Sequence, residues 1–237
     1  MPLKTFFIRL HKWVALVVGL QMFLWVAGGL LMSLSDIDEV HGDLTKARLE
    51  PRPLRWDQLV AIESIIARVP APIAELSVSP GFFGPQYRLT DTSGAVHHFD
   101  AQTGKPLGEI DATQALEIAQ TNYAGSASGG PPTRVTENST EYRDRLPAWR
   151  VDFNDEAATT LYVAADNGDV VTRRNRIWRI YDIAWMLHIM DYREREDFNH
   201  ALLVWASALA LLIVLSGVYL IVVARWRADF RWLSRRG

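Results

Sequence analysis

Two long runs without charge constrain this chain more than any other feature of its sequence. The first, Trp13 to Leu34, holds 22 residues, and the second, Ala201 to Ala224, holds 24. A helix rises 1.5 Å per residue, so each run spans roughly 33 Å or more, enough to cross the hydrocarbon core of a bilayer. Both runs are too long for the apolar part of a cleavable signal peptide. The sequence therefore predicts two transmembrane helices, at 13–34 and 198–224.

The charged residues are distributed unevenly along the chain. Residues 1–12 carry a formal charge of +3 and residues 225–237 carry +4, so the overall charge of −2 leaves −9 for the residues between. The positive-inside rule then places both ends in the cytoplasm and the central domain across the membrane. For a bacterial chain, this predicts an inner-membrane protein with a periplasmic domain. An acidic domain of this kind does not suit nucleic acid as a partner, because a phosphate-binding surface is basic.

The residue types and motifs exclude several kinds of chemistry. The chain has no Cys, which excludes a disulfide scaffold, a thiolate zinc site and a cysteine nucleophile. It also lacks the GxGxxG, P-loop, HExxH and GxSxG patterns. We therefore expect no catalytic residue on this chain. Because no NAD or flavin fingerprint is present, the electrons for any redox reaction would have to come from a quinol, a reductase subunit or a haem.

The segment between the two spans repeats itself. In each half a stretch with helical spacing, at 54–68 and at 112–123, precedes several short β-like runs and a glycine turn. The two turn glycines, Gly104 and Gly168, lie 64 residues apart. A helix followed by an antiparallel strand set, twice over, predicts an α+β domain. The expected strands lie around 73–79, 85–91, 95–101, 134–138, 148–154 and 159–165.

The motifs of these repeats resemble a known family. The runs PQYRLTD…HHFDAQTGKPL and PAWRVDF…LYVAADNGDVV are similar to the PepSY domain. The signature RLHKW at 9–13 and the run WMLHIMDYREREDFNH at 185–200 are similar to the PepSY-associated transmembrane family. The resemblance implies an α+β membrane protein in which two transmembrane helices flank a periplasmic domain of two PepSY-like helix-plus-antiparallel-sheet repeats, at 35–110 and 111–176. Larger members have four spans, so we expect this two-span chain to form a homodimer or to join a partner subunit in a redox complex.

With no Cys, the histidines are the strongest candidate metal ligands. His11 lies at the cytoplasmic end of the first span, where it is either an interfacial residue or an axial haem ligand. His97 and His98 are neighbours in an expected strand, so their side chains point to opposite faces and cannot hold one ion together. His41, seven residues beyond the first span, is expected at a similar height to His188 and His200 and could replace either as a ligand, but taken alone it is interpreted as a loop residue.

His188 and His200 are the pair that we interpret as haem ligands at the outer side of the membrane. His188 belongs to an expected interfacial amphipathic helix at 177–192, and His200 begins the second span, so both lie at one membrane depth. Asp191, one turn after His188, is expected to hold the second ring nitrogen of that histidine. Asp197 is the expected N-cap of the second span. The alternative is a purely structural role for this segment beneath the domain.

The sequence leaves two functions open. By resemblance, the first is an inner-membrane haem b protein that relays electrons to a periplasmic ferric siderophore or redox partner, as a ferric reductase-type oxidoreductase or its electron-transfer subunit. His188 and His200 would bind an outer haem, and His11 from two copies an inner one, since about 30 Å of bilayer separates the two depths. The second is a membrane-tethered PepSY module without a cofactor, which binds and regulates a peptidase or assembles a complex.

Overall fold

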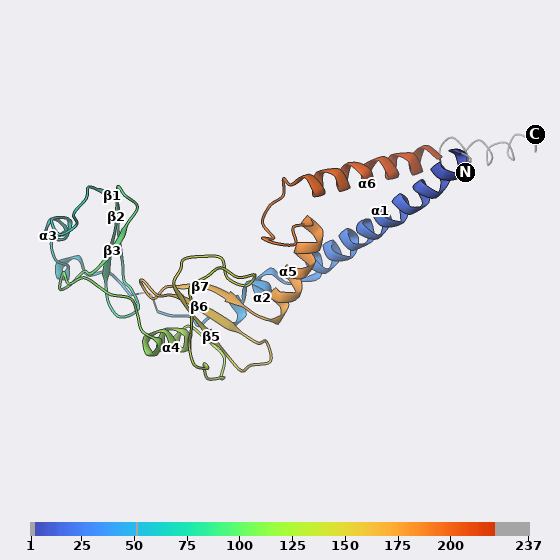
Figure 1. Ribbon diagram of the computed structural model, residues 1–237. Helices are drawn as coiled ribbons and strands as arrows, with labels where there is room; N and C mark the ends of the chain where they lie inside the picture. The colour runs from blue at the N-terminus through green and yellow to red at the C-terminus, as the bar shows by residue number, and fades with distance from the viewer. Residues whose placement is uncertain (1–2, 51, 221–237) are drawn as a thin grey trace, which may run out of the picture. The chain divides into compact units, whose positions relative to one another are not determined.

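The computed structural model describes residues 3–50 and 52–220. Asp36–Arg179 form one compact unit of the chain, and Met1–Ser35 together with Ile180–Gly237 form a second. The first, called here the sheet unit, holds two small β-sheets and the helices beside them (Figure 1). The second, called the helical unit, holds two long apolar helices.

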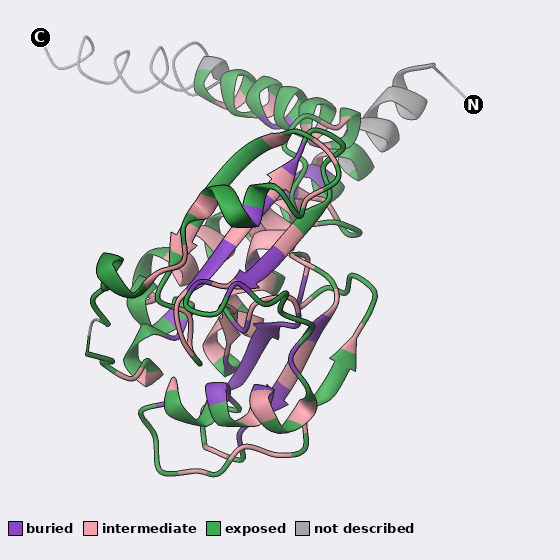
Figure 2. Ribbon diagram, turned by 90° about the vertical axis from the view of Figure 1, so that its left-hand side faces the viewer, coloured by how far each residue is buried: buried purple, intermediate pink, exposed green. Residues whose placement is uncertain are grey.

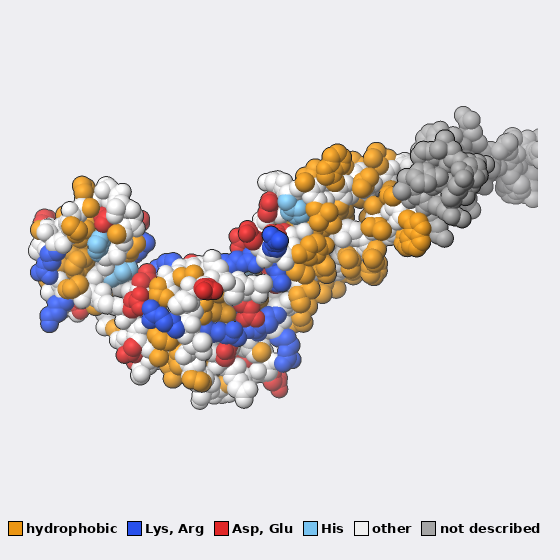
Figure 3. All heavy atoms as spheres, in the orientation of Figure 1, with side chains coloured by type: hydrophobic (Ala, Val, Ile, Leu, Met, Phe, Trp, Pro, Cys, Tyr) orange, Lys and Arg blue, Asp and Glu red, His pale blue; other side chains and the backbone are white. Residues whose placement is uncertain are grey.

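The helical unit contains two helices that are long and apolar enough to cross a membrane. They are α1 (Leu3–Leu34) and α6 (Ala201–Leu220), whose apolar segments are Trp13–Leu34 and Ala201–Val218. In each segment only 6% of the hydrophobic window is buried, and hydrophobic side chains dominate the face of the two helices that Figure 3 shows. The two helices also pack against each other. A helix that is apolar on all sides needs a non-aqueous environment, which agrees with the predicted association with a membrane.

Some predicted features of the chain ends lie outside the described residues. They are the side chain of His11, the end of the second span at 221–224 and the basic tail at 225–237. The start of the second apolar helix is described, and it lies at Ala201. The predicted start at 198 is therefore three residues too early.

A helix is present in the segment where an interfacial helix was predicted, and it is shorter than expected. Helix α5 spans Arg176–Ile189 and ends before Met190, whose φ of +57° is the left-handed conformation in which helices commonly end. Its first turn is closed by Asn175, whose side-chain oxygen accepts a hydrogen bond of 2.6 Å from the backbone nitrogen of Trp178.

The first sheet of the sheet unit is an antiparallel meander in the order β1-β2-β3. Its strands are β1 (Ile73–Ser79), β2 (Gln86–Asp91) and β3 (Val96–Asp100). One face of this sheet packs on α3 (Ile62–Ile66), so that the buried side chains of the strands meet those of the helix (Figure 1). The buried residues of this core are Ile65, Tyr87, Leu89, Phe99 and Ala101.

The second sheet is antiparallel in the order β4-β5-β6-β7 and packs on helix α4 (Ala112–Thr121). A capping box fixes the start of α4, because Asp111 and Gln114 each bond the backbone nitrogen of the other. Buried residues run along the strands of this sheet (Figure 2). The strands are β4 (Thr133–Val135), β5 (Ala148–Asp152), β6 (Thr160–Ala164) and β7 (Val170–Arg174). The remaining short helices are α2 (Ile37–His41), η1 (Asp43–Thr45) and η2 (Trp56–Gln58).

This architecture confirms the predicted α+β class and the two antiparallel sheets. The repeat in the sequence corresponds to a repeat in the pairing, because Tyr87 lies opposite Phe99 in the first sheet and Trp149 lies opposite Val163 in the second. The two turn glycines also match in conformation, with φ of +68° at Gly104 and +77° at Gly168.

Two predictions about the secondary structure were wrong. The helix expected at 54–68 is divided into η2 and α3, because Leu59 is extended and the backbone nitrogen of Val60 donates to the carbonyl of Ala101, 2.8 Å away. Strand β7 was not expected, since the run after the Gly168 turn shows no clear alternation of apolar and polar residues. It is formed by pairing with β6, a tertiary effect that a local pattern does not show.

We expect Gly168→Ala to lower the stability of the sheet unit by about 1–2 kcal/mol, because a side chain is disfavoured at positive φ. A Cβ atom at this position would also lie 2.8 Å from Cδ1 of Ile118. Thermal unfolding of the protein in detergent measures the effect. Gly108→Ala is the matched control, because a Cβ there meets nothing within 4 Å. Equal midpoints for the two variants would show that the turn tolerates a side chain.

Candidate functional site

His200 closes the first turn of α6. Its Nε2 lies 2.9 Å from the carbonyl oxygen of Ile189, and its Nδ1 lies 3.3 Å from the backbone nitrogen of Leu203. A carbonyl only accepts, so Nε2 carries the proton and Nδ1 is the acceptor for the Leu203 N–H. His200 is therefore the N-cap, and the predicted cap, Asp197, instead accepts from the backbone nitrogen of Asn199 at 2.7 Å. In this arrangement neither ring nitrogen of His200 is free to bind iron.

His188 and Asp191 do not form the predicted pair. Asp191 lies beyond the end of α5, so it is not one helical turn from His188 on the same face. Its carboxylate accepts four backbone N–H groups of the following loop, and these bonds, of which that from Glu196 has the largest effect, lower the pKa of Asp191. The four residues whose backbone nitrogens donate to Asp191 are Arg193, Glu194, Glu196 and Asp197. The Nδ1 atom of His188 is buried and has no hydrogen-bond partner among the described residues.

The loop between α5 and α6 is fastened to α5 by Arg195. The guanidinium of Arg195 pairs with the carboxylate of Asp182, and its backbone carbonyl accepts a 2.9 Å hydrogen bond from the indole nitrogen of Trp185. Trp185 in turn meets the ring of Phe198 edge to face, with 5.3 Å between the ring centroids. The segment that carries His188 and His200 is thus an ordered part of the helical unit.

The other histidines lie in the sheet unit or outside the described side chains. His41 is the last residue of α2, not a loop residue as expected. His97 contacts Asp91, with 3.0 Å between Nε2 and Oδ2, whereas His98 lies 3.5 Å from Asp166. The two neighbours in β3 therefore have different carboxylate partners, as their opposite directions predict. Across the described ranges, no three His, Asp or Glu side chains gather closely enough to hold a metal ion.

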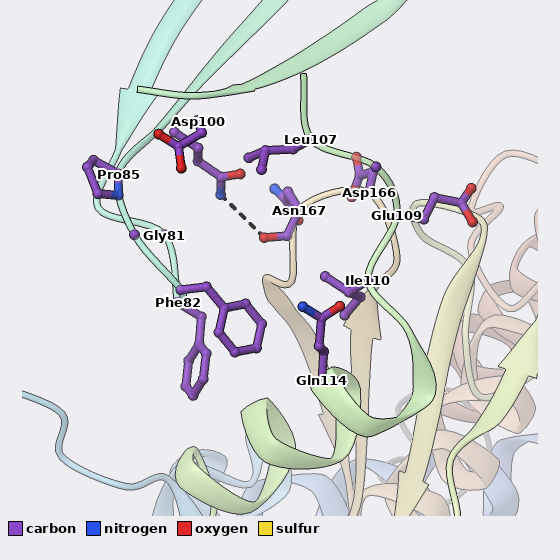
Figure 4. Close-up of a pocket in the computed structure, with 14 residues that line it drawn as sticks. Gly81, Phe82, Pro85, Asp100, Leu107, Glu109, Ile110, Gln114, Asp166 and Asn167 are labelled. Atoms are coloured by element: carbon purple, nitrogen blue, oxygen red, sulfur yellow. Dashed lines mark hydrogen bonds between the residues drawn. The ribbon is translucent and has the colours of Figure 1, made fainter. Parts of the chain in front are cut away.

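A cavity of about 260 Å³ lies between the two sheets of the sheet unit (Figure 4). The loop between β1 and β2 contributes Phe82, and the end of β3 contributes Asp100. The connection from the first repeat to the second contributes Leu107 and Ile110. Helix α4 and the β6–β7 turn complete the wall. Because these elements belong to both repeats, the cavity exists only when both are folded.

Two of the carboxylates that line the cavity, those of Asp100 and Asp166, keep their charge at neutral pH. Burial raises the pKa of Asp100, but hydrogen bonds from the backbone nitrogens of Thr103 and Gln102 outweigh it and lower the pKa. Burial likewise opposes the charge of Asp166, and the neighbouring His98 and Arg145 still lower the pKa of this carboxyl. Oδ1 of Asp166 is buried without a hydrogen-bond partner among the described residues.

The rest of the lining is apolar or uncharged, except for the carboxylate of Glu109. Gln114 and Asn167 present amides, and the side chain of Gln86 donates to the carbonyl of Asn167 at 3.3 Å, which joins the two repeats across the cavity (Figure 4). Glu109 pairs with Arg134. No described lining residue is Lys, Arg or His, so the carboxylates give the lining a negative character.

Sequence analysis did not find this cavity. The glycine turns were expected, but the site depends on how two repeats meet, which periodicity does not show. One local signal was present, because the loop PGFFGP places two phenylalanines between Gly-Pro pairs, and Phe83 is 53% exposed. Aromatic side chains left exposed in a loop mark candidate binding sites.

Comparison with known proteins gives no relative from which a function can be transferred. No family model, curated protein or solved structure matches the chain. The resemblance to the PepSY families therefore stays a prediction from motifs, and a function has to be argued from the site.

Proposed function

We propose that this protein is a membrane-anchored binding module whose ligand site is the cavity between the two sheets. The single observation that carries the proposal is a 260 Å³ cavity lined by both repeats of the sheet unit. The two apolar helices would anchor the chain in a bacterial inner membrane, and the charge pattern would place the sheet unit in the periplasm. Pockets of a few hundred Å³ with a mostly apolar lining and a few polar groups are the usual form of ligand sites.

The lining favours a ligand that combines an apolar body with a positive charge. Asp100 and Asp166 supply negative charge, and the exposed Phe83 supplies an aromatic ring that attracts cations. A lysine or arginine side chain of an extended polypeptide meets both requirements. This ligand class agrees with the regulatory module that the sequence left open, since such a module recognises a protein partner.

Leu107→Trp is expected to fill the cavity and to weaken binding of a basic peptide about tenfold or more, which corresponds to a loss of about 1.4 kcal/mol of binding free energy. Leu107 lines the cavity and is 42% exposed, so the larger side chain has room to turn inward without disturbing a core. Short peptides with a central Lys, norleucine or Glu serve as probes, and calorimetry on the full chain in nanodiscs measures their affinity.

Leu76→Trp is the matched control, because Leu76 is 44% exposed and lies on β1, away from the cavity lining. We expect binding in the order Lys, norleucine, Glu for the wild type and for this control. Equal affinity of the three peptides, or an equal effect of the two tryptophans, would overturn the proposal.

Haem binding with electron relay is the second candidate, and one observation favours it. The buried Nδ1 of His188 has no hydrogen-bond partner among the described residues, which suits a metal-binding nitrogen. His200 does not fit as the second ligand, because both of its ring nitrogens are engaged. The second ligand would have to come from elsewhere, such as a second copy in the homodimer, and the acceptor would be a ferric siderophore or redox partner.

An optical spectrum of the purified protein, before and after dithionite, tests this candidate. Haem in the protein gives a Soret band that sharpens on reduction, and His188→Ala should remove it. Protein from haem-replete cells without such a band would contradict haem binding and leave the binding module as the function.

A further inference from the structure

The first sheet has a second face, opposite the one that packs on α3 (Figure 1). Side chains alternate along a strand, and Tyr87 and Leu89 point into the core with α3. Arg88 and Thr90 therefore lie on the opposite face. His98 lies on that face too, since it is the cross-strand partner of Arg88 in the β2–β3 ladder.

Unpartnered buried atoms concentrate on this face. Nine buried side-chain nitrogen or oxygen atoms lack a hydrogen-bond partner in the described part of the chain, and five of them belong to Arg88, Thr90, His98 and the adjacent Asp166. Buried polar atoms are nearly always paired in folded proteins, so such a concentration requires an explanation. The five atoms are Nε of Arg88, Oγ1 of Thr90, Nδ1 and Nε2 of His98, and Oδ1 of Asp166.

Two donors of this group, Nε of Arg88 and Oγ1 of Thr90, have no hydrogen-bond acceptor among the described residues. No hydrogen bond or ion pair joins the half-buried guanidinium of Arg88 to any other described residue. The side chain of His98 is only 6% exposed, and Nε2 lies 3.5 Å from Oδ2 of Asp166, close enough for an ion pair but without a hydrogen bond. A partly buried positive charge without a counter-ion is unfavourable, so an anion from outside the chain would relieve it.

We propose that this face binds a carboxylate group. The guanidinium fork matches the two oxygens of a carboxylate, and Thr90 and His98, whose polar side-chain atoms are buried, lie on the same face. The nearby carboxylates favour a ligand with a single negative charge, because Asp166 lies beside His98 and Glu75 lies opposite Thr90. Phosphate, with up to two negative charges, would be repelled more strongly by these two carboxylates.

This site goes beyond the proposed function and does not depend on it. The pair of Arg88 and His98 lies two residues along the strands from the pair of Gln86 and Asp100, which belongs to the cavity lining. The two sites are therefore neighbours with opposite preferences, positive groups in the cavity and a carboxylate on the sheet face. Occupation of one is not required for occupation of the other.

Nuclear magnetic resonance of the arginine Nε–Hε groups in the full chain tests the proposal directly. The signal that disappears in Arg88→Gln is assigned to Arg88, and sodium acetate is titrated against the wild type in detergent micelles, with sodium chloride as the control. We expect acetate to shift the Arg88 signal in a saturable way and equal chloride to leave it unchanged. An unmoved signal at saturating acetate, or an equal shift with inorganic phosphate, overturns the proposal.

Variants separate this face from the opposite face of the sheet and from a structural role of Arg88. We expect Arg88→Lys to weaken acetate binding about tenfold through loss of the bidentate fork and Glu75→Gln to strengthen it. Leu76→Trp should leave it unchanged, because Leu76 lies opposite Leu89, on the face that packs on α3. Arg88→Gln should keep the thermal midpoint of the protein without ligand, because no internal bond is lost. A lower midpoint for Arg88→Gln would show that Arg88 holds the fold, which contradicts the proposal.

The source of the carboxylate is distinguished by two further probes. N-acetyl-dialanine with a free carboxyl end and the same peptide with an amide end are compared with acetate. Tighter binding of the free acid than of acetate would support a polypeptide C-terminus as the ligand, and equal affinities would support a small organic acid. Binding of the amide as tight as that of the acid overturns the proposal.

Discussion

Replacing Arg179 by alanine is expected to lower the free energy of unfolding by about 2–3 kcal/mol, the largest loss that we expect from a single polar side chain. Arg179 donates from Nε to Glu141 at 2.7 Å and from Nη2 to the second oxygen of the same carboxylate at 3.2 Å. It also donates to the carbonyl of Ala158 at 2.8 Å and to the hydroxyl of Thr160 at 3.1 Å. Its removal leaves the partly buried Glu141 without its main partner.

Chemical unfolding of the full chain in detergent measures this effect. Arg179→Lys keeps the positive charge but loses the two parallel hydrogen bonds to Glu141. We therefore expect a loss of stability between those of the wild type and Arg179→Ala. Arg55→Ala is the control for the removal of an exposed ion pair, since the side chains of Arg55 and Asp57 are 65% and 68% exposed, and such pairs contribute little. If Arg179→Ala were as mild as Arg55→Ala, the network around Glu141 would not stabilise the fold.

Acid is expected to destabilise the sheet unit steeply below about pH 4. A hydrogen bond from His97 is the main cause that lowers the pKa of Asp91, and Arg179 lowers the pKa of Glu141 from its ordinary value of 4.5. Hydrogen bonds from Thr159 and Tyr123 overcome the effect of burial and lower the pKa of Asp155 from 3.8. A carboxyl with a lowered folded pKa contributes stability that is present above its unfolded pKa and is lost as pH falls through the folded value.

The unfolding midpoint measured from pH 7 to pH 2 checks this expectation. The midpoint should be nearly flat above pH 5 and should fall below pH 4, where the unfolded chain begins to bind more protons than the folded chain. Asp155→Asn should be less stable than the wild type at pH 7 and should lose less on acidification. A wild-type midpoint that stayed constant down to pH 2 would mean that these carboxylates are not held by their partners.

Local sequence patterns were sufficient to predict the helices and strands that depend mainly on neighbouring residues. The two apolar helices follow from uninterrupted runs, and strands such as β1 and β6 follow from β-like runs bounded by turns. The helix expected at 54–68 failed because Val60 is drawn into a backbone bond with Ala101. That bond joins residues 41 positions apart, so no window of neighbouring residues contains it.

The candidate site was less predictable than the fold, for a similar reason. The choice of His188 and His200 rested on their residue type and depth, whereas their hydrogen bonds depend on how the loop after Ile189 turns. An aspartate one turn after a histidine supports it only if the helix continues, and the left-handed Met190 ends the helix first. The cavity is made where two repeats meet, and each repeat alone would show only a loop or a turn.

The imidazole of His200 also determines how the second apolar helix can move. The same ring accepts a hydrogen bond from the first turn of α6 and donates one to the last carbonyl of α5, so this side chain links the end of α5 to the start of α6. A tilt of α6 against the end of α5 has to break one of these two bonds. The direction in which α6 leaves the loop therefore depends on the end of α5. A movement of that end of α5 would change the angle of α6.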